Sequence, residues 1–233
     1  MEKQEKPQVY EDKYYLPKVL VTLFGAAILI KDLIKIYNIS CWYYLFIIPG
    51  WVVADLIAGI VHWFGDSYSG YGMEFLFHDF LEHHREPSAM LKRDYFQISF
   101  DTYILYILAS FAGLSNSFMT CVALFAMQAN FCHRESHKYN KAHWTFKILQ
   151  SLGLSISPKA HHVHHTIPYN RDYCVFSGFL NPLLQYIDFW RRVERTIYFF
   201  TSFKSVEMRR LHPKLPDDEN LYQRFVTAVT IEF

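Results

Sequence analysis

Long apolar stretches separated by short polar segments occupy the first half of the chain. After a polar leader at residues 1–18, an apolar stretch runs through residues 19–36 and is charged only near its end. In residues 40–61 the only charged residue is Asp55, and these 22 residues match the roughly 20 that cross a bilayer as a helix. The pattern therefore predicts two membrane-spanning helices.

A further apolar region contains 31 consecutive residues, 102–132, without Asp, Glu, Lys or Arg. One helix of that length is too long for a bilayer, and the turn-forming sequence at residues 113–117 divides the region into two short helices. We therefore expect an all-α, multi-pass membrane protein with about four transmembrane helices. The alternative is a soluble helical protein, although so long a charge-free run is difficult to bury in a small domain.

The distribution of basic residues predicts the orientation of these helices. With four spans, the loops on one side hold only Lys31 and Lys35 of the 23 basic residues. Because Lys and Arg accumulate on the cytosolic side, we expect both termini to face the cytosol. Residues 1–18 then form a cytosolic leader, residues 19–195 a membrane-embedded domain and residues 196–233 a cytosolic tail. The acidic leader has neither transit-peptide nor cleaved-signal character.

Composition excludes several classes of protein. Hydrophobic residues make up 52% of the chain and charged residues 19%, which excludes a disordered protein. A net charge of +1 gives no global field for a polyanion, so we expect no nucleic-acid partner. The four cysteines show no C-x-x-C spacing and make a zinc ribbon improbable. The unusual feature is the 12 histidines, of which 11 fall between His62 and His165.

The first two of four histidine groups flank the end of the second predicted span. His62 and Asp66 are four residues apart and therefore share one helix face. An ionisable residue at a membrane boundary needs a partner and is a functional candidate, although a structural hydrogen bond explains this pair equally well. His83 and His84 are adjacent and are a weak signal alone.

The other two groups have the spacing of metal ligands on helices. His133 and His137 stand at i and i+4, as the two histidines of an H-E-x-x-H helix do. His161, His164 and His165 stand at i, i+3 and i+4, which places three imidazoles on one helix face.

Topology brings all four groups to the cytosolic side of the membrane, where they can form one site. A zinc ion takes about three or four protein ligands, so eight imidazoles are too many for one ion and indicate a two-metal centre. Nitrogen-rich ligation suits iron, although imidazole also binds zinc, copper and nickel.

The histidines stand in four longer sequence blocks with one further segment after them. The blocks are ADLIAGIVHWFGD at 54–66, EHHREPSA at 82–89, NFCHRESH at 130–137 and HHVHHTIPY at 161–169, and FWRRVE follows at 189–194. In these blocks the chain resembles the Kua family of membrane lipid desaturases. The resemblance covers about residues 40–195. It implies a multi-pass, non-haem di-iron desaturase that uses O₂ and receives electrons from cytochrome b5.

The resemblance also implies which residues form the site. The metal ligands are expected to be His62, His83, His84, His133, His137, His161, His164 and His165. Asp66 is expected to be the essential acidic companion, which orients an imidazole or takes part in proton delivery. The histidines outside the family pattern are expected to be bystanders: His78, His143, His162 and His212.

We therefore expect an enzyme of the endoplasmic reticulum membrane that converts the O-alkyl chain of plasmanylethanolamine to the vinyl ether of a plasmalogen. Four basic residues are candidates for holding the phosphate of this membrane lipid: Arg134, Lys138, Lys159 and Arg171. Glu135 occupies a position that is usually aromatic in animal and bacterial members, which bears on the substrate. The alternatives are an acyl-lipid desaturase acting on another phospholipid or chain position, a different metal-dependent membrane oxygenase or hydrolase, and a non-catalytic scaffold.

Overall fold

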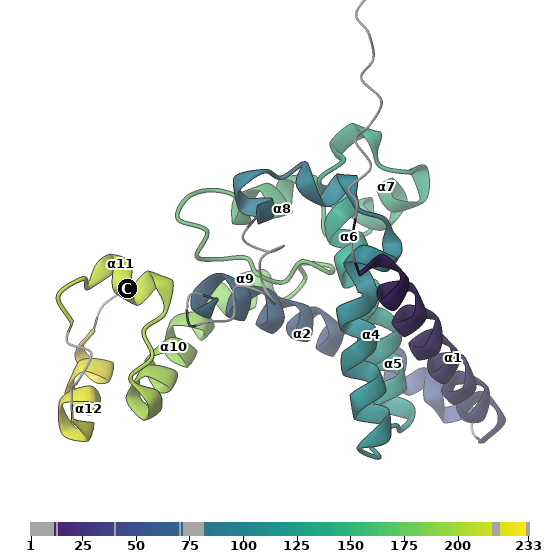
Figure 1. The fold of residues 1–233 in the computed structure, drawn as a ribbon, viewed down its shortest axis with the longest axis horizontal. Coiled ribbons are helices and arrows are strands. Elements are labelled where there is room, and N and C mark those ends of the chain that lie inside the picture. The colour runs from purple at the N-terminus through teal and green to yellow at the C-terminus, as the bar shows by residue number, and fades with distance from the viewer. Residues whose placement is uncertain are drawn as a thin grey trace, which may run out of the picture.

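The computed structural model describes residue 12, residues 14–39, 41–69, 71, 82–215 and 220–231. Every regular element in these ranges is helical, which confirms the all-α prediction for the described chain (Figure 1). The α-helices are α1 (Tyr15–Ile39), α2 (Ile47–Tyr68), α4 (Tyr95–Phe111), α5 (Ser117–Ala126), α6 (Ala129–Ser136), α7 (Trp144–Ser151), α8 (Pro158–His164), α9 (Asn181–Tyr186), α10 (Phe189–Thr201), α11 (Val206–Leu211) and α12 (Leu221–Thr230). Three short 3₁₀ helices are η1 (Cys41–Phe46), η2 (Ala89–Lys92) and η3 (Tyr139–Lys141), and residues 82–85 form one further helical turn.

Polar residues at the turns determine where several helices begin. The side-chain oxygen of Asn116 accepts the backbone N–H three residues on at the start of α5, and Gly113 adopts a φ of +74° in the preceding turn. The apolar region 102–132 is thus divided at the turn that its sequence predicts. Ser157 caps α8 in the same way, and Pro158 follows as the first residue of that helix.

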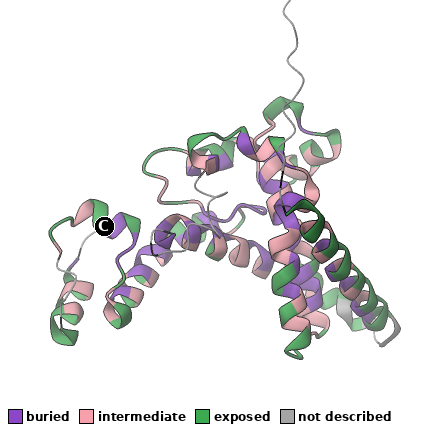
Figure 2. Ribbon diagram, in the orientation of Figure 1, coloured by how far each residue is buried: buried purple, intermediate pink, exposed green. Residues whose placement is uncertain are grey.

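The first half of the chain forms a group of long helices. Helix α1 packs along α4, and α2 packs along α5 (Figure 1). The core between α1, α4 and α5 is apolar and contains Leu29, Tyr103, Tyr106, Ala123 and Met127. The outer side of α1 is largely exposed (Figure 2) and carries apolar residues, among them Leu20, Leu23 and Phe24. Exposed apolar surface on this scale indicates contact with lipid or with another protein.

One helical segment in the described part of the chain, Tyr44–Tyr68, is long and apolar enough to cross a membrane. Helix α1 is long as well but contains Lys18, Lys31, Asp32 and Lys35. Helices α4 and α5 are 17 and 10 residues long, compared with the roughly 20 residues of a typical membrane-spanning helix. The four predicted spans are therefore helices in the structure, and one of them meets the criteria of length and composition.

Helix α2 is held against the segment at residues 173–180 by one carboxylate and one glycine. Asp55 is completely buried and accepts the backbone N–H groups of Ser177, Gly178 and Leu180 at 2.8, 3.1 and 3.1 Å. A Cβ atom on Gly59 would lie 2.6 Å from the sulfur of Cys174, so only glycine permits this close approach. The buried acid Asp55 is thus a structural anchor.

A buried polar network ties the C-terminal helices to α2. The carboxylate of Glu194 in α10 accepts hydrogen bonds from Trp63 at 3.0 Å and from Arg191 and Ser205 at 2.7 Å. Trp63 also stacks on Trp190, with 5.5 Å between ring centroids. Helix α10 runs through position 195, where the sequence suggests that the membrane-embedded domain ends, and α12 packs against it.

Candidate metal centre

Five histidines from three segments form the first group of potential metal ligands: His83, His133, His137, His161 and His165. Each offers a nitrogen atom, and these five atoms lie within 4.8 Å of one another. The Nε2 atoms of His133, His137 and His161 lie 2.9 to 3.3 Å apart. Because a metal–imidazole bond is about 2.1 Å long, nitrogen atoms around one ion must approach one another this closely.

The second group contains His62, Asp66, His84 and His164, whose donor atoms also lie within 4.8 Å of one another. Asp66 is central to this group. Its Oδ1 atom lies 3.0 Å from His84 Nε2, and its Oδ2 atom lies 3.5 Å from the Nε2 atoms of His62 and His164. Three nitrogens and a carboxylate form a donor set typical of a first-row transition metal.

The two groups are immediate neighbours. The ring centroids of His83 and His84, one from each group, are 4.4 Å apart. The rings of His62 and His133 are 5.2 Å apart, and those of His84 and His165 are 4.9 Å apart. The arrangement therefore has the form of a two-metal centre rather than two separate sites.

The local sequence explains how each segment presents its donors. In α2 and α8 the spacing of three or four residues aligns the side chains on one face, as expected from helical periodicity. Helix α6 ends at Ser136, so His137 is its C-cap and still stands one turn after His133. His165 is likewise the C-cap of α8. The helical turn at residues 82–85 contributes the remaining pair.

The protonation state of the histidines suits metal binding. Burial, followed by a nearby histidine, lowers the pKa of His137 to about 4 and that of His165 to about 2. Burial also lowers the pKa of His164 to about 4, against the opposing effect of Asp66. These imidazoles are therefore neutral at physiological pH, which is the form that ligates a metal.

Within the part of the chain that the structure describes, three buried nitrogens of two of these histidines have no hydrogen-bond partner: Nδ1 and Nε2 of His165 and Nε2 of His164. The Nδ1–H group of His164 donates to the carbonyl oxygen of Arg171 at 2.8 Å, so its Nε2 atom carries the lone pair and faces Asp66. Such buried lone pairs are destabilising without a partner, and a bound metal is a suitable one.

All nine residues expected from the sequence come together in these two groups. His143 and His162 are exposed and His212 ends α11, all outside both groups, and His78 lies outside the described residues.

The four basic residues considered for phosphate binding have other surroundings. Arg134 donates to the carbonyl oxygen of Leu91, and Lys159 is exposed. Lys138 pairs with the buried carboxylate of Glu135 at 2.5 Å, which also accounts for this unusual acidic position. Arg171 lies 3.8 Å from the carboxylate of Asp172.

Sequence reasoning missed the residues that support the histidines from behind. Tyr173 is buried, and its ring lies 5.3 Å from that of His164 and 6.3 Å from that of His62. It shields the second group from solvent. The only signal in the sequence is its position a few residues after the last histidine group. Glu194, which holds Trp63 next to His62, belongs to the FWRRVE segment that the resemblance had already marked.

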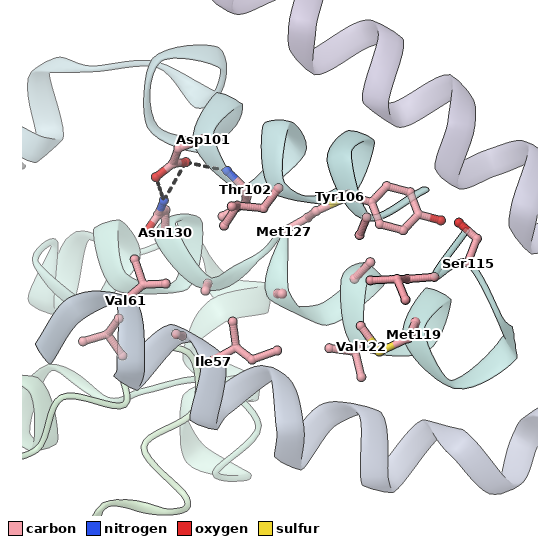
Figure 3. A pocket seen from close by; sticks show the side chains of 18 residues that line it. Ile57, Val61, Asp101, Thr102, Tyr106, Ser115, Met119, Val122, Met127 and Asn130 are labelled. Atoms are coloured by element: carbon pink, nitrogen blue, oxygen red, sulfur yellow. Dashed lines mark hydrogen bonds between the residues drawn. The ribbon is translucent and has the colours of Figure 1, made fainter. Parts of the chain in front are cut away.

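An apolar cavity of about 250 Å³ is shown in Figure 3. Part of its wall is formed by residues within one helical turn before the ligands of α2 and α6. Its walls come mainly from α2, α4 and α5. Ala58 and Val61 in the cavity wall precede His62, and Ala129 precedes His133 by one helical turn. Asp101 and Asn130 are polar residues of the wall, and the amide of Asn130 donates to Asp101 at 3.3 Å (Figure 3).

Comparison with known proteins identifies a matching family and several relatives. The model of the lipid desaturase domain family matches residues 51–207. The chain is 28% identical to plasmanylethanolamine desaturase 1 of Mus musculus over 68% of this chain and 66% of the mouse protein. It is 29% identical to plasmanylethanolamine desaturase of Myxococcus xanthus over 67% of this chain and 60% of that protein. It is 32% identical to the chloroplastic fatty acid desaturase 4-like 1 of Arabidopsis thaliana over 64% of this chain and 55% of that protein.

These matches confirm the resemblance that the histidine blocks carry. The chain spans less than two thirds of the length of each of these relatives. No solved structure matches the chain.

Proposed function

Because the chain belongs to the lipid desaturase family, which its residues 51–207 match, we propose that it converts the O-alkyl chain of plasmanylethanolamine to a vinyl ether. In this reaction an –O–CH₂–CH₂– unit, O₂, two electrons and two protons give an –O–CH=CH– unit and two molecules of water. The electrons come from cytochrome b5. The observation that carries the proposal is the two-group cluster of eight histidines and Asp66 beside an apolar cavity.

In this proposal, each of the two donor groups provides the ligands of one iron. The five-histidine group would hold one ion, and the group of three histidines with Asp66 would hold the other. An iron pair supplies an oxidant strong enough to break an unactivated C–H bond, which side chains alone cannot do. Within 3.5 Å of three imidazole nitrogens, Asp66 is better placed to bind an ion directly than to orient a histidine from outside.

The protein's own residues prepare this site in two ways. The hydrogen bond from His164 to the carbonyl oxygen of Arg171 selects the tautomer whose Nε2 atom faces Asp66. Tyr173 and the buried network around Glu194 exclude water behind His62 and His164. Exclusion of water protects reactive species from side reactions with solvent.

We further propose that the enzyme lies in the endoplasmic reticulum membrane with about four spans, residues 19–195 as its desaturase domain and both termini in the cytosol. The apolar segment Tyr44–Tyr68 and the exposed apolar residues of α1 and α4 support membrane insertion. A cytosolic site would also face a cytosolic electron donor.

Desaturation of an acyl chain is the second candidate. The chloroplastic relative, named as a fatty acid desaturase, has the highest identity of the three relatives, 32%, although over a shorter region. An acyl chain and an alkyl chain would fit the same apolar cavity. The two reactions differ in product, because an acyl double bond survives mild acid whereas a vinyl ether is cleaved.

Reconstitution tests the proposed function directly. The full chain, in membranes with cytochrome b5, its reductase, NADH and O₂, receives plasmanylethanolamine or the corresponding diacyl lipid. We expect an acid-labile alkenyl product only from the alkyl substrate, only with O₂, and not from the His165→Ala variant. An acid-stable double bond formed from the diacyl lipid would favour the second candidate. Turnover without O₂ would contradict both.

A further inference from the structure

A second cavity, of about 470 Å³, adjoins the metal centre and has a different chemical character. Its walls come from the end of α2, the turn at residues 82–85, the segment at residues 168–173 and α11. Asp66 and His84, both members of the second donor group, form part of the wall. The cavity therefore opens directly on the candidate metal centre.

The two cavities lie on opposite sides of His62 along α2. The apolar cavity includes Ile57, Ala58 and Val61 in its wall, and the second cavity begins at Asp66. His62 stands between them, one residue after Val61 and one helical turn before Asp66. A molecule that occupied both cavities would thus pass the metal centre with one polar end and one apolar end.

The second cavity contains charges of both signs. Arg85 and Arg209 are exposed and form part of its wall, and Arg85 has no ion-pair partner among the described residues. The guanidinium of Arg209 lies over the ring of Tyr71, 5.0 Å from its centroid, which holds it in place without neutralising it. Two guanidinium groups on one cavity are well suited to a phosphate.

Two carboxylates, those of Asp66 and Glu207, form part of the same wall, and Glu207 is the one outside the donor groups. It is buried, and it accepts hydrogen bonds from Asn170 at 3.0 Å and from Arg210 at 2.6 and 2.8 Å. These contacts lower the pKa of Glu207, although burial alone would raise it, so the group stays ionised. A wall that carries carboxylates as well as two guanidinium groups complements a zwitterion better than an anion.

We propose that this cavity binds the phosphate and ammonium groups of a zwitterionic phospholipid, with the phosphate at Arg85 and Arg209 and the ammonium group near Glu207. The inference rests on the proposed function and extends it to recognition of the headgroup. It assigns headgroup recognition to residues other than the four basic positions considered from sequence, none of which lines this cavity. Because His62 is next to the headgroup cavity, the bond that reacts is close to the headgroup, and the rest of the chain occupies the apolar cavity.

Lipid retention by the purified full chain tests the inference without requiring turnover. The detergent-solubilised protein is incubated with equimolar phosphatidylethanolamine, phosphatidylglycerol and diacylglycerol, and the bound lipids are quantified by mass spectrometry. We expect phosphatidylethanolamine to be enriched over diacylglycerol, and Arg85→Gln/Arg209→Gln to reduce that enrichment at least tenfold. Arg192→Gln, at an exposed arginine of α10 outside the cavity, is the matched control and should retain it.

Two further arms identify the ligand chemistry. Soluble phosphoethanolamine should compete with the bound lipid, whereas inorganic phosphate at the same concentration should compete less, since it lacks the ammonium group. Glu207→Gln should shift retention from phosphatidylethanolamine towards phosphatidylglycerol, in a variant whose melting temperature shows that it is folded. Equal retention of diacylglycerol and phosphatidylethanolamine by the wild-type chain, or unchanged retention by the double arginine variant, would overturn the inference.

The outcome separates this inference from the proposed function. A chain that retains phosphatidylethanolamine through its two arginines but forms no vinyl ether would support the headgroup cavity and contradict the reaction. If the wild-type chain and the Arg85→Gln/Arg209→Gln variant both form the vinyl ether with the same KM, the proposed reaction would be supported and the headgroup cavity contradicted.

Discussion

Replacement of Asp55 by Asn is a stringent test of how α2 is anchored, because the substitution changes charge and hydrogen bonding with almost no change in volume. In the structure, Oδ1 accepts two backbone N–H groups and Oδ2 accepts a third, from Leu180. The Asn side chain can retain its oxygen towards Ser177 and Gly178, but its NH₂ group then faces the N–H of Leu180. Two buried donors would oppose each other there.

The expected loss follows from these three contacts. A hydrogen bond to a charged group contributes about 1.5–3 kcal/mol and a neutral one about 0.5–1.5 kcal/mol, so each retained bond loses roughly 1 kcal/mol. The contact to Leu180 loses its full value, while removal of a buried charge offsets part of the total. We expect a net loss of about 3 kcal/mol, which lowers the melting temperature by about 6–12 °C in a chain of this size.

Thermal unfolding of purified protein in detergent measures the effect. Asp188→Asn is the matched control, because the side chain of Asp188 is about half exposed and the residue has a φ of +53°, a conformation that Asn tolerates well. We expect that control to stay within about 0.5 kcal/mol of the wild type. A melting temperature for Asp55→Asn within 2 °C of the wild type would refute the anchoring argument, since no offset of that size is expected from charge removal alone.

Three other expectations concern the metal centre and the close contact beside it. Asp66→Asn should lower desaturation by more than the roughly 10–100-fold typical of a carboxylate that only orients a metal-bound histidine, because Asp66 is placed to bind an ion directly; near-wild-type turnover would remove Asp66 from the site. Metal analysis should give about two irons per chain, reduced in His165→Ala and unchanged in the exposed control His162→Ala; a single tightly bound zinc would contradict the desaturase proposal. Gly59→Ala should destabilise the fold by about 1–3 kcal/mol through its clash with the Cys174 sulfur, and Cys174→Ala in the same chain should restore part of that loss.

The helices and the histidine cluster were predictable because both depend on short-range periodicity. A spacing of three or four residues places His161, His164 and His165 on one side of any helix, and no tertiary information is needed. The break before α5 was likewise predictable, because Gly113 and Asn116 are turn-forming residues. The predicted topology supplied the next step, because it places the four groups on one side of the membrane, and the resemblance indicated which residues of the groups are ligands.

The supporting contacts could not be predicted, because they join residues far apart in the sequence. In the sequence, Asp55 is an acid within a predicted membrane span. Only the fold shows that it accepts hydrogen bonds from three backbone N–H groups more than 120 residues away. The headgroup cavity could not be predicted for the same reason. Arg85 and Arg209 line one cavity only because α11 packs against α2 in the fold. Local charge patterns favoured Arg134 and Lys138 instead, and these are engaged elsewhere.

The donors come from four separated chain segments, and this arrangement affects how stable the protein is against degradation in the cell. Ions bound to these donors would tie α2, the turn at residues 82–85, α6 and α8 together, and so close three intervening loops of the chain. Closing such loops opposes folding by an entropy that grows with the logarithm of their length, and a ligand that binds only the folded form offsets it. A newly made chain that lacks metal would open more often and expose itself to proteolysis. The amount of this protein should therefore follow the iron supply of the cell, even where transcription is constant.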